Sequence, residues 1–292
     1  MSVASSFVLP VDKPAGPTSH DVVARARRAL GTRRIGHTGT LDPFASGLLL
    51  LCVGNATRIA EYLTDLPKTY LATARLDGRT LTDDNTSALA ESSEAWRALS
   101  VEQVDAALQQ QVGDILQLPP QYSAKKVAGE RAYAIARRGE TATLQPVRVH
   151  VQGITLLRAE LPEIEFEVHC SSGTYIRAMA RDLGDALGTG GYLTKLRRTR
   201  IGGHAVERAV ALDELGDADT VGRSAIGLLQ ALAHLPAVSL NEEQERAVGY
   251  GQAIAFDAAD AQALLLVREG RLMAIGRAEG GQVKPHKVFV DA

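Results

Sequence analysis

Asp42, in the loop from Gly36 to Ser46, is a candidate catalytic carboxylate. The residues of this loop, GHTGTLDPFAS, place Asp42 alone among glycines and threonines, just before the apolar run LLLLCV. Because Pro43 biases the preceding residue away from the helical region, Asp42 also fits an ordinary turn. An aspartate at its usual pKa is ionised at pH 7 and can act as a nucleophile without a base to activate it. Two interpretations therefore remain, a structural turn and a nucleophilic site.

The sequence lacks the residues that several other kinds of active site require. A glycosidase uses two carboxylates about 5–10 Å apart, and the next acid after Asp42 is Glu61, on a predicted helix. The glycines match neither GxxxxGK(S/T) nor a GxGxxG that follows a strand, so no nucleotide-binding loop is predicted. Cys52 and Cys170 lie far apart in apolar surroundings without metal-ligand spacing. We expect both to be reduced core residues, and we expect no metal.

The elements that must position this loop can be predicted from hydrophobic periodicity and from capping residues. Thr18 or Ser19 begins a helix that Gly31 ends, and Ser100 and Gln103 form a capping box. Pro10, inside the first strand, predicts an edge position for that strand. Strands are predicted within residues 7–16, 48–54, 68–77, 146–157 and 163–170, and helices within 18–31, 55–65, 100–113, 130–138, 172–188 and 223–233. This interspersed order indicates a mixed α/β or an α+β sheet.

The chain divides into two predicted units. Residues 1–234 form the larger one, and within it residues 119–148, which are rich in Lys and Arg, form an arm over the main body. Beyond Pro236 the pattern changes to short strands, so residues 235–292 are expected to form a small β-barrel beside the larger unit.

Charge is unevenly distributed, although the formal net charge is only −2. The stretch from Val22 to Thr40 carries five arginines and no acid, and residues 121–150 carry six Lys and Arg against two acids. Such patches fit a surface that binds a polyanion, and they fit solvated helix faces about equally well. The start of the chain lacks the pattern of a signal peptide, and its apolar runs are too short to span a bilayer. We expect a cytoplasmic protein.

Six segments in order resemble the motifs of one enzyme family. They are VDKPAGPTSHDVV (11–23), GHTGTLDPFASGLLLLCVGNAT (36–57), KTYLATARLDGRTLTDD (68–84), PPQYSAKKVAGERAYAIARRG (119–139), CSSGTYIRAMARDLGDALG (170–188) and LTKLRRTRIG (193–202). Together they resemble the TruB family of pseudouridine synthases, which modify uridine 55 in the T loop of tRNA. The resemblance implies an α+β pseudouridine synthase fold, with a mixed, mainly antiparallel sheet flanked by helices. Residues 235–292 resemble a PUA RNA-binding domain more weakly.

The resemblance implies a role for specific residues of the active site. Asp42 would be the nucleophilic carboxylate, which either adds to the sugar C1′ or abstracts a 2′ proton, and no cofactor would be needed. Arg177 would hold Asp42 by an ion pair, since a guanidinium fork suits a carboxylate. Tyr70 would stack on the uracil and assist removal of the C5 proton. Leu196 and Tyr175 would support the pocket. Without the resemblance, Tyr70 would be interpreted as a core tyrosine of a strand, and Tyr175 and Leu196 fit plain core positions about equally well.

The resemblance also implies how the RNA is held. The target uridine lies inside a folded loop, and extruding it costs about a few kcal/mol of unstacking. His37 would stack in the opened loop, at an exposed tip that Gly36 and Gly39 permit. Lys125 and Lys126 in the arm would contact phosphates. The expected partner is the T stem-loop of tRNA, with no membrane and no obligatory protein partner, and the chain is expected to be a monomer.

Two alternatives belong to different functional classes. In the first, the protein opens and refolds tRNA as a chaperone, and chemistry is secondary or lost. In the second, it is a related synthase that acts on another RNA with a guide. The presence of Asp42, Arg177 and Tyr70 together argues against lost chemistry, and the basic arm favours an enzyme that chooses its own substrate.

Overall fold

The computed structural model describes residues 6–123, 125–127, 129–256 and 259–289. A large mixed sheet forms its centre, with the main strand order β14-β1-β3-β12-β4-β11-β10-β7. These strands are β14 (Val210–Ala211), β1 (Phe7–Lys13), β3 (Ser46–Val53), β12 (Tyr192–Ile201), β4 (Lys68–Arg75), β11 (Glu163–Cys170), β10 (Val147–Glu160) and β7 (Gly113–Gln117). Three short strands pair outside this path: β2 (Ile35–His37) with β3, β13 (His204–Ala205) with β12, and β15 (Ile226–Gly227) with β1.

Most pairings in this sheet are antiparallel. The parallel ones join β1 to β14 and β3 to β12. The predicted α+β class with a mixed, mainly antiparallel sheet is therefore confirmed. The helices are α1 (Ser19–Ala29), α2 (Ala60–Thr64), α3 (Val101–Gln109), α4 (Ala132–Arg137), α5 (Ile176–Leu187), α6 (Ala218–Ser224), α7 (Leu228–Ala231) and α8 (Glu242–Gly249). No helix in the part of the chain that the structure describes is long and apolar enough to cross a membrane.

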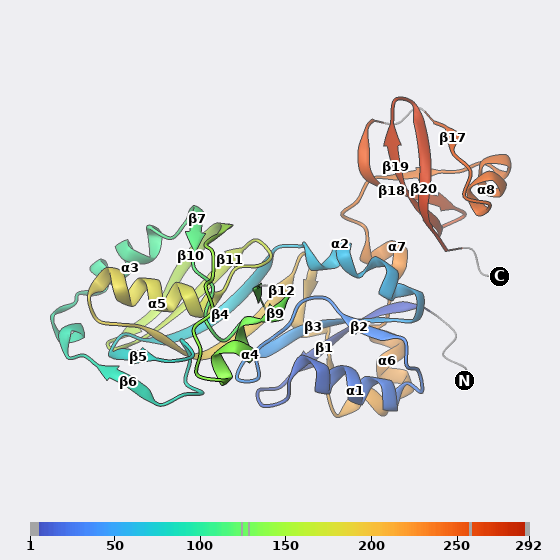
Figure 1. Cartoon of the computed structure of the whole chain (residues 1–292). Helices are drawn as coiled ribbons and strands as arrows, with labels where there is room; N and C mark the ends of the chain where they lie inside the picture. The colour runs from blue at the N-terminus through green and yellow to red at the C-terminus, as the bar shows by residue number, and fades with distance from the viewer. Residues whose placement is uncertain (1–5, 124, 128, 257–258, 290–292) are drawn as a thin grey trace.

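Helices cover the large sheet through separate apolar clusters. Helices α3 and α5 pack on the half formed by β4, β10 and β11, where Phe166 is fully buried. Helix α1 packs with α6 on β1 and β3 through Val22 and Val221. Figure 1 shows these helix pairs at opposite ends of the elongated sheet. The large sheet is thus continuous, and the two pairs of helices pack at its two ends.

The C-terminal residues form a second sheet of five strands. Its order is β16-β18-β19-β20-β17, which curls into a half-barrel beside helix α8. The strands are β16 (Ala237–Ser239), β17 (Ile254–Ala255), β18 (Ala261–Arg268), β19 (Arg271–Glu279) and β20 (Gln282–Val288). An apolar cluster that includes Leu63 of α2 and Leu265 of β18 joins this sheet to the larger unit. Arg58 Nη1 also donates to the Val288 carbonyl.

Smaller elements complete the chain. Strands β5 (Gly78–Thr80) and β6 (Leu89–Ser92) form one hairpin, and β8 (Lys126–Val127) and β9 (Glu130–Arg131) form another within the predicted arm. The predicted arm helix is present as α4, and the capping box at Ser100 and Gln103 is present at the start of α3. Thr18, rather than Ser19, caps α1 and forms a capping box with Asp21.

Two predictions about these elements are wrong. Strand β1 is not at an edge, because β3 pairs along its whole length and β14 and β15 pair on its other side. Pro10 falls between the residues that pair with β15, which end at Val8, and those that pair with β14, which begin at Val11. A proline without an N–H is tolerated where a strand changes partners. The single helix expected over residues 223–233 is also absent, because β15 separates α6 from α7.

Gly47 allows β3 and β12 to approach each other. Its φ is +103°, and a Cβ built on it would lie 2.2 Å from the backbone oxygen of Arg198. We predict that Gly47→Ala lowers the free energy of unfolding by about 2 kcal/mol or more, since left-handed strain and overpacking add. Urea unfolding measures this. Gly153→Ala is the matched control, because a Cβ on that strand glycine meets nothing within 4 Å. Equal stability of the two variants would contradict the prediction.

Candidate active site

A pocket of about 450 Å³ opens beside Asp42, between the large sheet and the start of α5. This volume lies in the usual range of small-molecule sites, about 300–1,000 Å³. The predicted site residues that line it come from four separate segments: Asp42, Tyr70, Tyr175, Arg177 and Leu196. The structure thus brings together residues that are up to 154 positions apart in the sequence.

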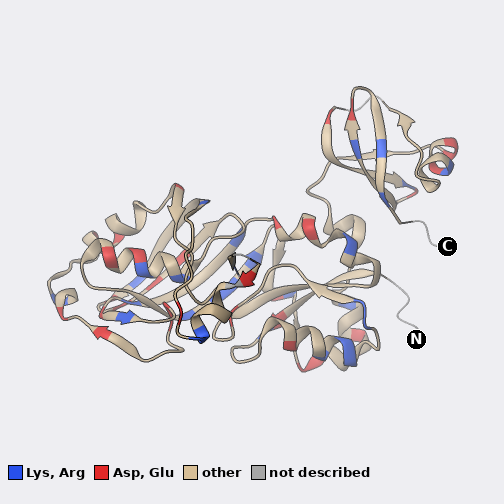
Figure 2. Cartoon of the chain, viewed as in Figure 1, with Lys and Arg blue, Asp and Glu red and all other residues tan. Residues whose placement is uncertain are grey.

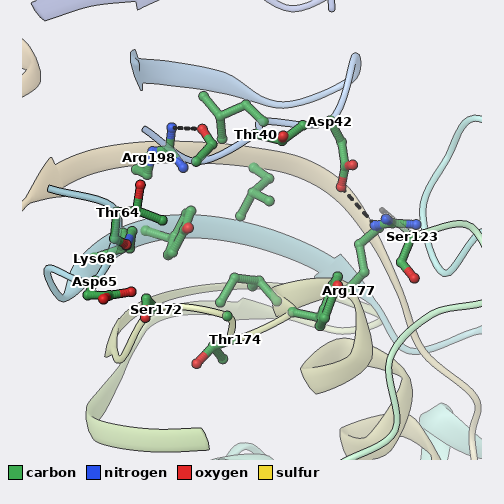
Figure 3. Close-up of a pocket in the computed structure, with 17 residues that line it drawn as sticks. Thr40, Asp42, Thr64, Asp65, Lys68, Ser123, Ser172, Thr174, Arg177 and Arg198 are labelled. Carbon is green, nitrogen blue, oxygen red and sulfur yellow. Dashed lines mark hydrogen bonds and ion pairs between the residues drawn. The ribbon is translucent and has the colours of Figure 1, made fainter. Parts of the chain in front are cut away.

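The ion pair expected between Asp42 and Arg177 is present. Arg177 Nε lies 2.9 Å from Asp42 Oδ2, and Figure 3 shows this contact at one end of the pocket. The Arg177 side chain is only 4% exposed, whereas that of Asp42 is 37% exposed. A buried guanidinium needs compensating charge and acceptors. The carboxylate is therefore fixed in orientation and still open to the pocket.

Arg177 has three further partners that the sequence did not suggest. Its Nη1 donates to the Thr82 carbonyl at 2.7 Å and lies 3.6 Å from the buried carboxylate of Asp84. Its Nη2 donates to the Tyr122 carbonyl at 2.8 Å, at the base of the predicted arm. One guanidinium thereby joins the Asp42 loop, the loop after β5 and the arm.

The backbone of the Asp42 loop is fixed from outside the loop. Ser19, at the start of α1, accepts from the Leu41 N–H at 2.9 Å and donates to the Leu41 carbonyl at 3.1 Å. Arg198 Nη2 donates to the Gly39 carbonyl at 3.1 Å. The Pro43 carbonyl accepts from Gly16 N–H at 2.7 Å. These bonds satisfy main-chain groups of a partly buried loop, and they fix the position of the backbone that carries Asp42.

Positive charge gathers at the other end of the pocket. Figure 3 shows Arg198 and Lys68 there, across the pocket from Asp42 and Arg177, and Figure 2 shows basic residues along the central strands. Arg198 is 1% exposed and also donates to the Leu48 carbonyl. Burial, with Arg198 nearby, lowers the pKa of Lys68 to about 8. Because strand side chains alternate, the position of Arg198 two residues after Leu196 was the signal that could have placed it in the pocket.

The aromatic residues of the pocket are both held in place. Tyr70 is 8% exposed, and burial raises the pKa of its phenol, although Arg198 opposes this rise. At neutral pH the Tyr70 phenol is therefore protonated. The backbone N–H and carbonyl of Tyr175 are both bonded to the side chain of the buried Gln117. Burial also raises the pKa of Tyr175.

The remaining predicted residues lie outside this pocket. His37 ends β2 and is partly buried, with its ring edge-on to His20 at 5.6 Å between centroids. The expected exposed loop tip is therefore wrong, because β2 pairs His37 with Leu51 of β3. Burial, with His20 and Arg198 nearby, lowers the pKa of His37. Lys125 is exposed in the arm, and Lys126 belongs to β8, but its side chain lies outside the described part of the structure.

Family models match most of the chain. The model of the N-terminal domain of TruB family pseudouridylate synthases matches residues 27–176, and that of the tRNA pseudouridylate synthase B C-terminal domain matches residues 177–232. The chain belongs to the TruB family. It is therefore a pseudouridine synthase, an isomerase, and the Asp42 pocket lies within the region that these models match.

Other proteins of the family are similar to this chain over nearly their whole length. A protein named tRNA pseudouridine synthase B from Mycolicibacterium paratuberculosis is 46% identical over 279 residues, 94% of each chain. Another of that name, from Thermobifida fusca, is 45% identical and is matched over 97% of this chain and 98% of its own.

Solved structures share the fold. A chain in an H/ACA ribonucleoprotein bound to a substrate RNA containing 2′-deoxyuridine has a TM-score of 0.76 at 25% identity, covering 98% of this chain and 85% of that one. A chain of an archaeal box H/ACA complex has a TM-score of 0.74 at 25% identity, covering 97% and 86%. The pseudouridine synthase fold expected from the sequence is therefore confirmed.

The Ser19 hydroxyl bonds to both the N–H and the carbonyl of Leu41, so removing it should destabilise the fold. We predict that Ser19→Ala lowers the free energy of unfolding by about 1–3 kcal/mol, because it leaves a buried N–H and a buried carbonyl without their partner. Urea unfolding tests this against Ser239→Ala, which removes an exposed hydroxyl in β16. A loss no greater than that of the control would show that the loop does not depend on Ser19.

Lys68 should titrate far below the usual lysine range, near 10.4. With a pKa of about 8, its amine loses its proton as the pH rises from 7 to 9, and the pocket loses positive charge. NMR of ¹⁵N-labelled lysine side chains should show midpoints near pH 8 for Lys68 and for the buried Lys13, whose pKa burial also lowers to about 8. Lys68→Met should remove one of these two signals. Their absence from that pH range would refute the expected effect of burial.

Proposed function

We propose that this chain converts uridine 55 in the T loop of tRNA into pseudouridine, with Asp42 as the nucleophile and without a cofactor. The observation that carries the proposal is the 2.9 Å ion pair between Asp42 and Arg177 at a pocket of nucleotide size. It occurs in a chain that is similar, over nearly its whole length, to proteins named tRNA pseudouridine synthase B.

In the proposed reaction, the C1′–N1 bond of the target uridine breaks, the uracil turns, and a C1′–C5 bond forms. The proton on C5 leaves, and N1 gains one, so the product is an isomer of the substrate. Asp42 acts on the nucleotide from the pocket wall. Arg177 holds this carboxylate in a fixed orientation, because its guanidinium pairs with Asp42 Oδ2 at 2.9 Å.

The other wall residues would hold the uracil. In our proposal Tyr70 stacks on the base and Leu196 packs against it, while Tyr175 supports the pocket from the start of α5. The raised pKa of Tyr70 leaves its phenol protonated at neutral pH. This favours the stacking role over direct removal of the C5 proton.

A uridine within a folded loop must be turned out of the stack to reach Asp42. We propose that His37 stacks in the opened loop, since RNA bases stack on aromatic side chains that include histidine. Entry of RNA would require His37 to leave its packing on His20. Lys125 and Lys126 of the arm would contact phosphates.

The proposal extends to the organisation and setting of the protein. Residues 1–234 would form the catalytic domain with the arm at 119–148, and residues 235–292 would form a PUA-like RNA-binding domain. The partner would be tRNA, which a monomer would bind in the cytoplasm without an obligatory protein partner. The curled five-stranded sheet at 237–288 supports this division.

The test uses a tRNA transcript that carries tritium at C5 of its uridines. We predict that the protein releases tritium from position 55, and that Asp42→Asn lowers the rate by at least about 10⁴-fold, as expected for loss of a nucleophile. Filter binding should show that this variant keeps its affinity for the transcript. A transcript with cytidine at position 55 should release no tritium.

Asp65→Asn is the matched control, because Asp65 is another carboxylate that lines the same pocket. It should keep most of the rate. If tritium release were absent while RNA binding was intact, the proposed chemistry would be wrong and an RNA chaperone would remain. If both variants lost activity equally, the role assigned to Asp42 would be wrong.

A further inference from the structure

A second groove, of about 1,090 Å³, lies apart from the catalytic pocket. Its lining includes an apolar part formed by Pro10, Leu66, Pro67 and Ala231. We call it the rear groove, because it lies on the other face of the large sheet. The strand register shows this: β12 pairs Arg198 with Tyr70 and Arg200 with Thr69. Neighbouring residues of β4 point to opposite faces, so Arg200 points away from the face that carries Tyr70.

The rear groove is strongly cationic. Arg200, Arg208 and Arg223 line it, and no Asp or Glu of the described residues does. All three arginines are exposed, and none is ion-paired with a carboxylate in the described ranges. Arg197, which also lies on β12, has by contrast a partner in Asp12 at 2.7 Å. Arg223 donates to the Thr220 hydroxyl, which in turn donates to Asp217, and this acid does not line the groove. Three guanidinium groups around one concavity focus a positive potential there.

Two histidines also line the groove. Burial lowers the pKa of His204 and His234, and each carries an imidazole into a partly apolar lining. At neutral pH the arginines therefore supply the charge, while the imidazoles and prolines offer flat, uncharged surface. Guanidinium groups bind phosphate through two parallel hydrogen bonds, and bases stack on histidine and apolar side chains.

We propose that the rear groove is a second binding site for nucleotide phosphates, separate from the pocket that holds Asp42. The two sites share one wall. Thr64, Asp65 and Lys68 line the catalytic pocket, and Leu66 and Pro67, between them in sequence, line the rear groove. A nucleotide of the RNA substrate or a free nucleotide could supply the phosphate, and the experiment separates these sources.

The test compares two triple variants that remove the same charge. The groove variant is Arg200→Gln, Arg208→Gln, Arg223→Gln. The control variant is Arg97→Gln, Arg158→Gln, Arg246→Gln, which changes three arginines that pair with carboxylates elsewhere. Both are made in the Asp42→Asn chain, so that RNA binds without turnover. Circular dichroism melting confirms that each variant folds.

Filter binding of a full tRNA transcript is measured at several salt concentrations. The groove variant should bind at least about tenfold more weakly at low salt, and its salt slope should be shallower by about 2, since each phosphate contact contributes about 0.7–0.9. The control variant should change neither. The second arm titrates uridine 5′-monophosphate while arginine side chains are observed by NMR. Saturable shifts that the groove variant lacks would also support the site, with a free nucleotide as its ligand.

Two results would overturn the proposal. One is a groove variant that matches the control for transcript affinity, salt slope and monophosphate binding. The other is an equal loss of affinity in both variants, which would show only non-specific attraction. A separate measurement distinguishes failure of this proposal from failure of the proposed function. Both triple variants are made again with Asp42 in place, and tritium release from a short T stem-loop RNA is measured. Release should be the same in both triple variants, and a loss confined to the groove variant would place these arginines in catalysis instead.

Discussion

The ion pair between the buried guanidinium of Arg177 and Asp42 is the interaction on which the geometry of the Asp42 pocket depends. A charge that is 4% exposed is tolerable only when opposite charge and hydrogen-bond acceptors surround it. Here Asp42, Asp84 and the carbonyls of Thr82 and Tyr122 do so. Because these groups come from three segments that are otherwise irregular, the arrangement of the loops follows from satisfying one cation.

The order of the strands in the large sheet determines where the Asp42 loop lies relative to Tyr70. Strand β12 lies between β3, which follows the Asp42 loop, and β4, which carries Tyr70. The parallel contact of β3 with β12 is short, involving Ser46 and Gly47, and it lies directly after the loop. A glycine with a positive φ at this point lets two strand ends approach closely. Asp42 therefore stands over the middle of a continuous sheet rather than at its edge.

The sequence predicted the parts of the fold that depend on local physics. Helix α1, the capping box of α3 and strands β3, β4, β10 and β11 follow from periodicity and caps over a few residues. The environment of Pro10 did not follow, because two short strands from residues 210–227 pair beside it. His37 was expected at an exposed tip because of its glycines, but pairing with β3 overrides that local preference.

The site shows the same division. Periodicity and spacing left Asp42 as either a turn or a nucleophile, and only the resemblance to a family connected it with Arg177, 135 residues away. The bonds of Arg177 to the Thr82 and Tyr122 carbonyls carry no sequence signal, because every residue has a carbonyl. For Lys68 and Arg198 the sequence showed only that the side chains are basic, and it did not predict that they are buried. Their burial is a property of the packed sheet.

The anchors of the Asp42 loop have one consequence for how the site is encoded. Ser19, Arg198 and Gly16 bond to main-chain atoms of Leu41, Gly39 and Pro43. Main-chain atoms are common to all residue types, apart from the N–H that proline lacks. The position of Asp42 therefore depends largely on residues of other segments. The side chains of the loop itself can vary wherever its backbone conformation and its packing permit.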